Sequence, residues 1–395
     1  MPASLRTLAG LARTTAMLGL VVTTAVGCDT AGARSAPPPA SGCPAAETKA
    51  LALVLGAHAN SPAPQPSRYV NTLLDAAVDA KAPVVVVRVD GSPETVFSEA
   101  FRTNGQNDPA RAADRKAYIK RVKAVLRSTK AERPEADPLT ALALAARAVG
   151  PGGTVAIVDS GLQTVAPLDF RESGVLDAEP GDVAAFLARN ASLPQLTGIN
   201  VVLNGIGDTA VPQESLPLRR QGNLVAIWQA IAQKAKAACV SVDTTPRQGH
   251  SLPDTPAVSR VPVPAVETYT AGCGDHVLRN DGSVGFKPDL AVLRDPEAAR
   301  TALRELAGWA TTHDAKVRLT GTTASAGTEA GRTRLSLQRA EAVRTLLVDL
   351  GVPADRITVR GVGINWPGYV MDRADGTLLP GPAEHNRSVI LTLTC

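Results

Sequence analysis

Four residues in the first half of the chain have side chains that could take part in chemistry. Asp137 and Asp159 offer carboxylate oxygens of the kind that magnesium needs among its near-octahedral ligands. His58, Ser160 and Asp159 are together the residue types of a hydrolase. However, Ser160 lacks the Gly-x-Ser-x-Gly turn that exposes a nucleophile, and one well-placed aspartate makes a weak case for a metal. We therefore predict no catalysis and no cofactor, with Asp159 and Asp137 as weak metal candidates.

Five cysteines give a second chemical signal, because an odd number of thiols cannot all pair within one chain. Cys28 follows Arg6, Arg13 and the apolar run from Ala16 to Val26, and no acidic residue precedes it. This is the layout of a secretory signal peptide, since the run is short for a helix that spans a bilayer. A retained signal anchor is the alternative.

The residues Ala25-Val26-Gly27-Cys28 resemble the lipobox of bacterial lipoproteins. In that family the cysteine is lipid-modified and becomes the new amino terminus after cleavage. The resemblance implies a signal peptide over residues 1–27, lipidation at Cys28, and a protein anchored by lipid at the extracytoplasmic face of a cell membrane. Acyl chains contribute about 0.8 kcal/mol per buried methylene, so several of them anchor a domain firmly. Plain secretion is the alternative.

The remaining four cysteines are predicted to form disulfides, because export leads to an oxidising compartment. Four cysteines allow three connectivities, and the sequence alone does not choose between them. Their positions bracket two long patterned segments, which favours the pairs Cys43–Cys239 and Cys273–Cys395. Free buried thiols are the alternative, and none of the four has the spacing of a zinc or redox motif.

Two proline-rich segments divide the mature chain. A length of 395 residues predicts two or three domains. Residues 28–46 combine Cys28 with a tether that contains Pro37-Pro38-Pro39, and residues 245–266 contain five further prolines. We therefore predict one domain over residues 47–244 and a second over residues 267–395.

The composition excludes several classes of protein. With 44% hydrophobic residues, the chain is neither disordered nor a multi-span membrane protein. A formal net charge of +4 over this length, without a basic stripe interleaved with aromatics, gives no reason to expect a nucleic-acid partner.

Strand and helix patterns alternate through the first domain. Apolar runs at Leu51–Leu55 and Val84–Val87 are typical of buried parallel strands. Later segments predict a basic helix near Ala110–Arg127, helices at Pro138–Val149, Asp182–Asn190 and around Ile227, and strands at Val155–Val158, Ile199–Leu203 and Cys239–Val242. This alternation predicts an α/β fold with a parallel sheet, whose ligands sit at the carboxyl ends of the strands.

Three predicted strand ends carry the segments Gly56–Ser61, Asp137–Thr140 and Asp159–Gly161. Their order resembles the adhesion-site loops of a von Willebrand factor type A domain, where Asp-x-Ser-x-Ser, a threonine and an aspartate hold a metal ion. The resemblance implies that fold and a protein-binding role. Gly56 stands where the first aspartate is expected, and His58 and Asn60 replace the two serines.

The second domain has the pattern of an α+β fold. Asp295-Pro296 predicts a helix start, and the apolar positions from Ala299 to Ala310 repeat at helical spacing. A strand through Val317, a helix that Gly351 stops, a strand through Ile357 and a terminal strand at Val389–Thr394 complete the plan.

About 110 residues of this domain resemble the OmpA-like peptidoglycan-associated domain. The matching stretches are Leu319–Ala324, Gly327, Leu335-Ser336, Arg339-Ala340, Gly351–Ile357, Arg360–Gly363, Pro367 and Asn386–Val389. In that family a pocket holds the diaminopimelate residue of a peptidoglycan stem peptide. An aspartate binds the ammonium of the ligand, and an arginine before an alanine clamps a carboxylate, which suits a zwitterionic group.

The resemblance implies Arg339 as the carboxylate clamp, with Thr323, Asn386 and Arg387 lining the site. Ala324 stands in place of the expected aspartate, Thr322 in place of histidine and Arg332 in place of asparagine. Glu329, in the same loop, is a candidate substitute for the missing carboxylate. Alternatively, Arg339 is a solvated or salt-bridged helix residue.

These patterns predict a non-catalytic, lipid-anchored envelope protein. Its partners would be peptidoglycan at the second domain, a membrane through Cys28, and an unknown protein at the first domain. The alternative is an assembly module whose OmpA-like pocket has degenerated and binds no peptidoglycan.

Overall fold

The structure, a computed structural model, describes residue 43, residues 49–265 and residues 269–395, which belong to one compact unit, Ala40–Cys395. The predicted signal peptide and Cys28, the predicted lipidation site, lie outside these residues. Within the described ranges, no helix combines the length and apolarity needed to cross a bilayer.

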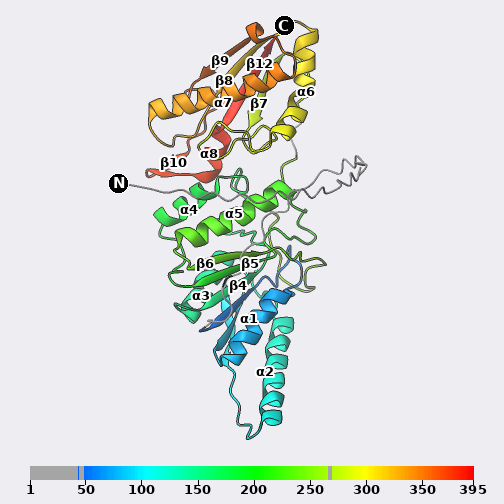
Figure 1. The fold of residues 1–395 in the computed structure, drawn as a ribbon, viewed down its shortest axis with the longest axis vertical. Coiled ribbons are helices and arrows are strands. Elements are labelled where there is room, and N and C mark those ends of the chain that lie inside the picture. Colours follow the sequence, from blue (N-terminus) through cyan, green and yellow to red (C-terminus); the bar gives the residue numbers. More distant parts are fainter. Residues whose placement is uncertain (1–42, 44–48, 266–268) are drawn as a thin grey trace, which may run out of the picture. The chain divides into compact units, whose positions relative to one another are not determined.

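A six-stranded sheet organises the first half of the chain, in the order β3-β2-β1-β4-β5-β6 (Figure 1). Its strands are β1 (Leu51–Leu55), β2 (Pro83–Arg88), β3 (Glu94–Ala100), β4 (Thr154–Val158), β5 (Asn200–Asn204) and β6 (Cys239–Asp243). All neighbours pair in parallel except β3, which runs antiparallel to β2 at the edge. The predicted parallel α/β fold is therefore confirmed, with one edge strand that the sequence did not reveal.

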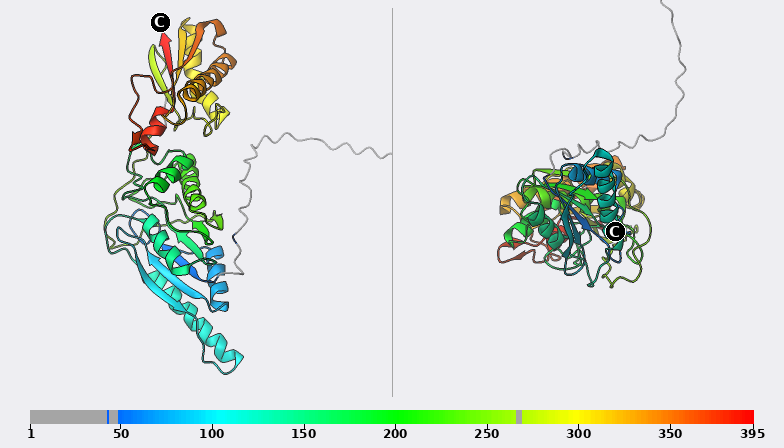
Figure 2. Two further views of the ribbon diagram at one scale, coloured as in Figure 1. Left: turned by 90° about the vertical axis from the view of Figure 1, so that its left-hand side faces the viewer. Right: turned by 90° about the horizontal axis from the view of Figure 1, so that it is seen from below.

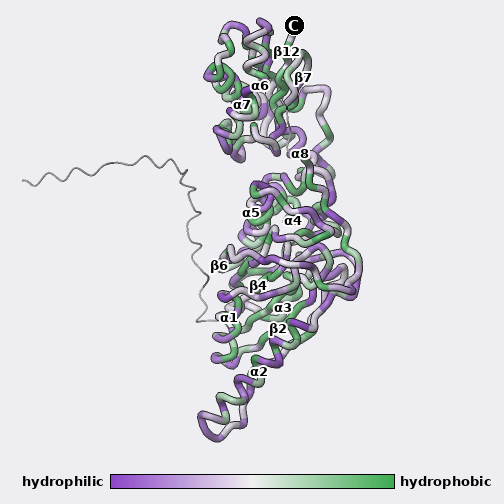
Figure 3. Tube along the Cα trace, turned by 90° about the vertical axis from the view of Figure 1, so that its right-hand side faces the viewer, coloured by the Kyte–Doolittle hydropathy of each residue, from purple (hydrophilic) through white to green (hydrophobic). Residues whose placement is uncertain are grey.

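Helices cover both faces of this sheet, and each face has its own apolar core. The helices are α1 (Arg68–Asp79), α2 (Asp108–Ser128), α3 (Pro138–Val149), α4 (Pro180–Arg189) and α5 (Leu218–Lys234). Leu51, Leu53 and Leu55 of β1 pack with α1 and α2, whereas Ala52 and Val54 pack with α3, α4 and α5. This explains why the central strands are apolar at every position, as their mostly hydrophobic colour in Figure 3 shows.

The second half of the chain folds around a four-stranded sheet, in the order β7-β12-β8-β9. Its strands are β7 (Gly274–Arg279), β8 (Lys316–Gly321), β9 (Ile357–Gly361) and β12 (Ser388–Thr394). The helices α6 (Pro296–Thr312) and α7 (Glu329–Asp349) share one core with it and lie on one face (Figure 2). A single 3-10 turn (Ala354–Arg356), a short hairpin of β10 (Arg373–Ala374) and β11 (Thr377–Leu378), and α8 (Pro380–Asn386) complete this half.

Local capping explains where the helices begin and end. The side chain of Asp295 accepts a hydrogen bond from the backbone of Ala298, with a proline following it, as the sequence predicts. Gly351, with φ at +98°, follows the end of α7, where a left-handed conformation favours glycine.

Two disulfides join the predicted pairs, Cys43–Cys239 and Cys273–Cys395. They link residues 196 and 122 positions apart, so each closes a long loop. In the chain-entropy model, cross-links of this length stabilise a fold by about 5 kcal/mol each.

The predicted connector, residues 245–266, packs in its described part against the first half of the chain. The side-chain amide of Asn60 donates to the carbonyls of Val258 and Ser259, and Gln213 exchanges two hydrogen bonds with Val261. Val258 and Val261 are buried in the core that contains α3, α4 and α5. The described part of the segment from Thr245 is thus a packed strap rather than a free linker.

Candidate functional site

Two residues at the carboxyl ends of β1 and β4 form a buried ion pair. His58 Nε2 lies 2.8 Å from Asp159 Oδ2, and both side chains are 1% exposed. Burial favours the neutral form of each residue, but attraction between the two charges outweighs it, so the pKa of His58 is raised and that of Asp159 is lowered. His58 Nδ1 also lies 2.6 Å from the carbonyl of Ala59, so both ring nitrogens face acceptors and the imidazolium form fits.

This pair determines what else the strand ends can hold. A Cβ atom on Gly56 would lie 1.9 Å from Asp159 Oδ2, so the pair and an aspartate at position 56 exclude one another. Asp137 caps α3 by accepting a hydrogen bond from Thr140, at 2.9 Å. Each candidate metal ligand therefore has a protein partner, and within the described residues no three His, Cys, Asp or Glu gather as a metal site.

The hydrolase arrangement does not form either. The Oγ atom of Ser160 accepts a hydrogen bond from the backbone of Leu162, while both nitrogens of His58 are engaged elsewhere. His58 is therefore not free to activate the serine.

A cavity of about 330 Å³ lies beside α7 in the second half of the chain. Its lining combines residues of three segments far apart in the sequence: Asp289, Thr323, Ala324, Ala326, Gly327, Thr328, Gly331, Arg332, Leu335, Arg339 and Arg387. We call it the Arg339 cavity. Its three arginines and one aspartate give it charges of both signs.

Arg339 is the central cation of this cavity. Its side chain is almost completely buried, its Nε donates to the carbonyl of Leu290 at 3.1 Å, and its guanidinium lies 5.3 Å from the ring centroid of Phe286. Among the described residues no carboxylate lies within ion-pair distance of the guanidinium. Burial lowers the pKa of Arg339 to about 10, although the charge of Glu179 opposes this shift. The remaining guanidinium donors are available to a ligand.

Asp289 places a carboxylate in the same cavity. It lies in the irregular segment between β7 and α6, with φ at +52°, and its negative charge raises the pKa of Arg339. Glu329 was the predicted substitute for the carboxylate that Ala324 lacks. It lines a separate cavity with Val362, Gly363 and Asn365. The carboxylate that accompanies Arg339 therefore comes from a position 50 residues earlier in the chain, which no local motif indicates.

Residues 285–369 match the model of the OmpA family. This segment is an OmpA-family domain. Among solved structures, the peptidoglycan-associated lipoprotein from Burkholderia pseudomallei is similar, with 24% identity over 28% of this chain and 86% of that chain, at a TM-score of 0.24. The cell wall anchor of the T6SS from Pseudomonas aeruginosa has 24% identity over 31% of this chain and 81% of that chain, at a TM-score of 0.25. No curated protein matches the chain.

The resemblance also implied that Thr323 and Asn386 line the ligand site. The structure places only one of these two residues in the lining of the Arg339 cavity. Thr323 lines the Arg339 cavity with a buried hydroxyl that has no hydrogen-bond partner among the described residues. Asn386 lies outside the lining, because its amide is engaged by the backbone of Val370, at 2.9 and 2.7 Å, and by Asp372.

Arg387 reaches the cavity edge but is surrounded by acids. Its guanidinium forms ion pairs with Asp182 of α4, with Glu179 just before that helix, and with Glu384. Burial alone would lower the pKa of Arg387, but these three carboxylates raise it. Burial also raises the pKa of Glu384 to about 7. Arg387 is thus a structural cation, in contrast to Arg339, which pairs with no carboxylate among the described residues.

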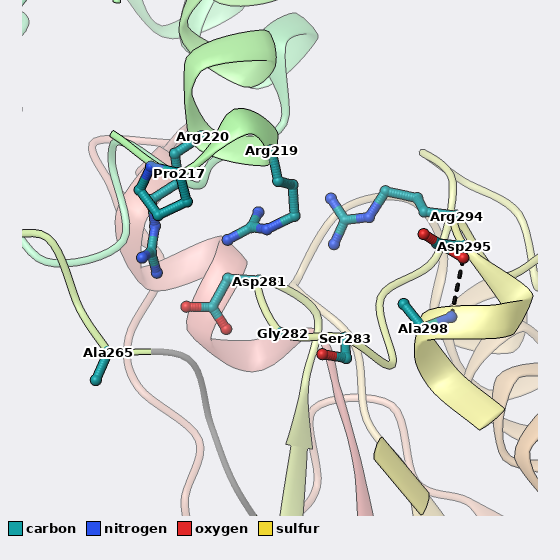
Figure 4. A pocket seen from close by; sticks show the side chains of 10 residues that line it. All are labelled: Pro217, Arg219, Arg220, Ala265, Asp281, Gly282, Ser283, Arg294, Asp295 and Ala298. Atoms are coloured by element: carbon teal, nitrogen blue, oxygen red, sulfur yellow. Dashed lines mark hydrogen bonds between the residues drawn. The ribbon is translucent and has the colours of Figure 1, made fainter. Parts of the chain in front are cut away.

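A second cavity, of about 440 Å³, lies near the beginnings of α5 and α6 (Figure 4). Arg219 and Arg220 line it, but both donate to Asp177, at 2.7 and 2.9 Å. Only Arg294 contributes a buried donor without a partner among the described residues, its Nη2. Of its three arginines, Arg294 alone is therefore left without a carboxylate partner among the described residues.

Proposed function

We propose that this is a non-catalytic envelope protein whose OmpA-family domain binds peptidoglycan through the Arg339 cavity. The observation that carries the proposal is the buried guanidinium of Arg339, which has no ion-pair partner in the part of the chain that the structure describes. It lies in a cavity that also contains the carboxylate of Asp289. The match of residues 285–369 to the OmpA family agrees with this role.

The ligand of the cavity would be the free end of a diaminopimelate residue, which carries one carboxylate and one ammonium. Arg339 would hold the carboxylate by charge-assisted hydrogen bonds, which are roughly twice as strong as neutral ones. Asp289 would accept the ammonium, in place of the carboxylate that Ala324 lacks. The hydroxyl of Thr323, which has no partner within the described ranges, supplies a further hydrogen-bonding group at the cavity wall.

The rest of the chain would place this domain in the envelope. Lipidation at Cys28 would anchor the protein at the extracytoplasmic face of a membrane. The first half would be a von Willebrand factor A-like domain that binds a protein, with the His58–Asp159 pair in place of the metal ion of the adhesion site.

Cosedimentation with purified peptidoglycan tests the proposal. The compact unit Ala40–Cys395 is expected to sediment with peptidoglycan, and the Arg339→Ala variant is expected to bind at least tenfold more weakly. Arg344→Ala, on the same helix, is the matched control, because Arg344 lies outside the cavity and pairs with Glu341. Equal binding of both variants would remove the proposed site.

A second function is supported by two observations. Ala324 lacks a carboxylate, and Arg387 is already saturated by Glu179, Asp182 and Glu384. These features favour an assembly module that binds a protein rather than peptidoglycan. Failure of the unit to bind peptidoglycan from any source would favour this alternative.

A further inference from the structure

The outer face of α2 carries a row of unpaired cations. Lys116, Lys120, Lys123 and Arg127 follow one another at intervals of four, three and four residues, so they share one face of the helix. All four are exposed, and none has an ion pair within the described part of the chain. We call this row the cationic face.

The other basic residues of α2 are neutralised. Arg111 pairs with Asp108, Arg115 with Asp75 and Asp79, and Arg121 with Glu99. The opposite face of the helix packs Tyr118, Val122 and Leu126 into the core, so it holds α2 in place and directs the cationic face outward. The contrast shows that only this face of the helix is left without counter-charges.

The charge of α2 is large relative to the whole chain. The helix contains seven Lys or Arg and two Asp, a net charge of +5, whereas the full chain has a net charge of +4. The rest of the chain therefore sums to −1. Like charges at these spacings repel one another and destabilise the helix, so an anionic partner would relieve a repulsion that the fold leaves uncompensated.

We propose that the cationic face binds the surface of a bilayer that contains anionic phospholipid. Three of its four residues are lysines, which act as flexible point charges and suit a diffuse layer of phosphates better than bidentate recognition. The exposed residues beside the row are alanines, Ala113, Ala117 and Ala124, so the helix can approach a flat surface closely. No exposed aromatic residue accompanies them, which favours contact with headgroups over insertion into the bilayer.

The binding is electrostatic and short-ranged. A basic residue near an anionic membrane contributes roughly a fivefold gain in partition, and the effect decays within a Debye length. The face would therefore orient the first half of the chain on a membrane, independently of the Arg339 cavity.

Sedimentation with lipid vesicles tests the proposal. The unit Ala40–Cys395 contains all three apolar cores and both disulfides, so it is suited to the test without the predicted lipid. It is expected to bind vesicles of phosphatidylcholine with about one third phosphatidylglycerol and not to bind vesicles of phosphatidylcholine alone. The bound protein is expected to dissociate as the salt concentration is raised.

Charge variants locate the contact. Lys120→Gln with Lys123→Gln is expected to reduce partition about 25-fold, whereas Lys120→Arg with Lys123→Arg retains it. Lys234→Gln with Lys316→Gln removes the same amount of charge from exposed positions elsewhere. This control variant is expected to change the partition onto vesicles less than twofold. Circular dichroism checks that α2 stays folded, and peptidoglycan binding should be unchanged. Equal loss in both glutamine variants, or binding to soluble dextran sulfate but not to the vesicles, would overturn the proposal.

Discussion

His58 and Asp159 form an ion pair that is closed off from solvent, with Nε2 of the histidine 2.8 Å from Oδ2 of the aspartate. The pair occupies the carboxyl ends of β1 and β4, where the resemblance to a von Willebrand factor type A domain predicted a metal site. Asp159 also accepts a hydrogen bond from the backbone of Gly161. The carboxylate is therefore satisfied by the protein itself.

Removal of the histidine should leave Asp159 as a buried charge without its ion-pair partner. We expect His58→Gln to lower the free energy of unfolding by about 3–5 kcal/mol, measured by urea denaturation near pH 6. The double variant His58→Gln with Asp159→Asn should regain part of this loss, because it removes the unpaired charge. A loss in the double variant equal to the sum of the two single losses would show that the pair is not coupled.

The same pair should make stability depend on pH. Because the pKa of His58 is raised above 6.5, its contribution is complete below that pH and is lost as pH rises through the folded-state pKa. Because the pKa of Asp159 is lowered below 3.8, its contribution is complete above that pH and is lost as pH falls through the folded-state pKa. The difference in unfolding free energy between wild type and the double variant should therefore be greatest from about pH 4 to 6.5. A difference that stays constant from mildly acidic to alkaline pH would contradict this account.

Asp289 should be needed for the ligand ammonium. We expect Asp289→Asn to weaken peptidoglycan binding about tenfold, because a charge-assisted hydrogen bond is replaced by a neutral one. Asp355→Asn, in the 3-10 turn and outside the cavity, is the matched control. Adding Ala324→Asp to the Asp289→Asn variant should restore binding. If the Asp289→Asn variant binds peptidoglycan as tightly as the wild type does, Asp289 is not the carboxylate that accepts the ligand ammonium.

Gly321 should tolerate no side chain. A Cβ atom at this position would lie 1.8 Å from the backbone carbonyl of Ser336, where β8 meets α7. Since backbone atoms cannot move aside as a flexible side chain can, Gly321→Ala should lower the free energy of unfolding by about 3 kcal/mol. Gly308→Ala, on α6, meets no atom within 4 Å and serves as the control, which should unfold at or above the wild-type denaturant concentration.

Elements with a local signal could be predicted from the sequence. The segment Pro138–Val149 was bounded correctly because Asp137 caps it and Pro138 begins it. The edge strand β3 was missed because Glu94–Ala100 is largely exposed and has no buried run to mark it. The two disulfides were predicted because each pair brackets one patterned segment.

The candidate site depends on contacts that no local pattern encodes. Asp289 reaches the Arg339 cavity through the fold, from a segment without regular structure. Arg387 was expected to line the ligand site, yet Glu179 and Asp182, more than 200 residues earlier, neutralise it. Such partners become visible only when the packing of α4 is known.

The most direct test of the central claim is a titration of the unit Ala40–Cys395 with two stem peptides. One carries diaminopimelate, and the other carries lysine at that position and lacks the side-chain carboxylate. Calorimetry should show at least tenfold tighter binding of the diaminopimelate peptide, and Arg339→Ala should abolish this preference. Equal affinity of the wild-type unit for both peptides would contradict the role of Arg339 as the carboxylate clamp.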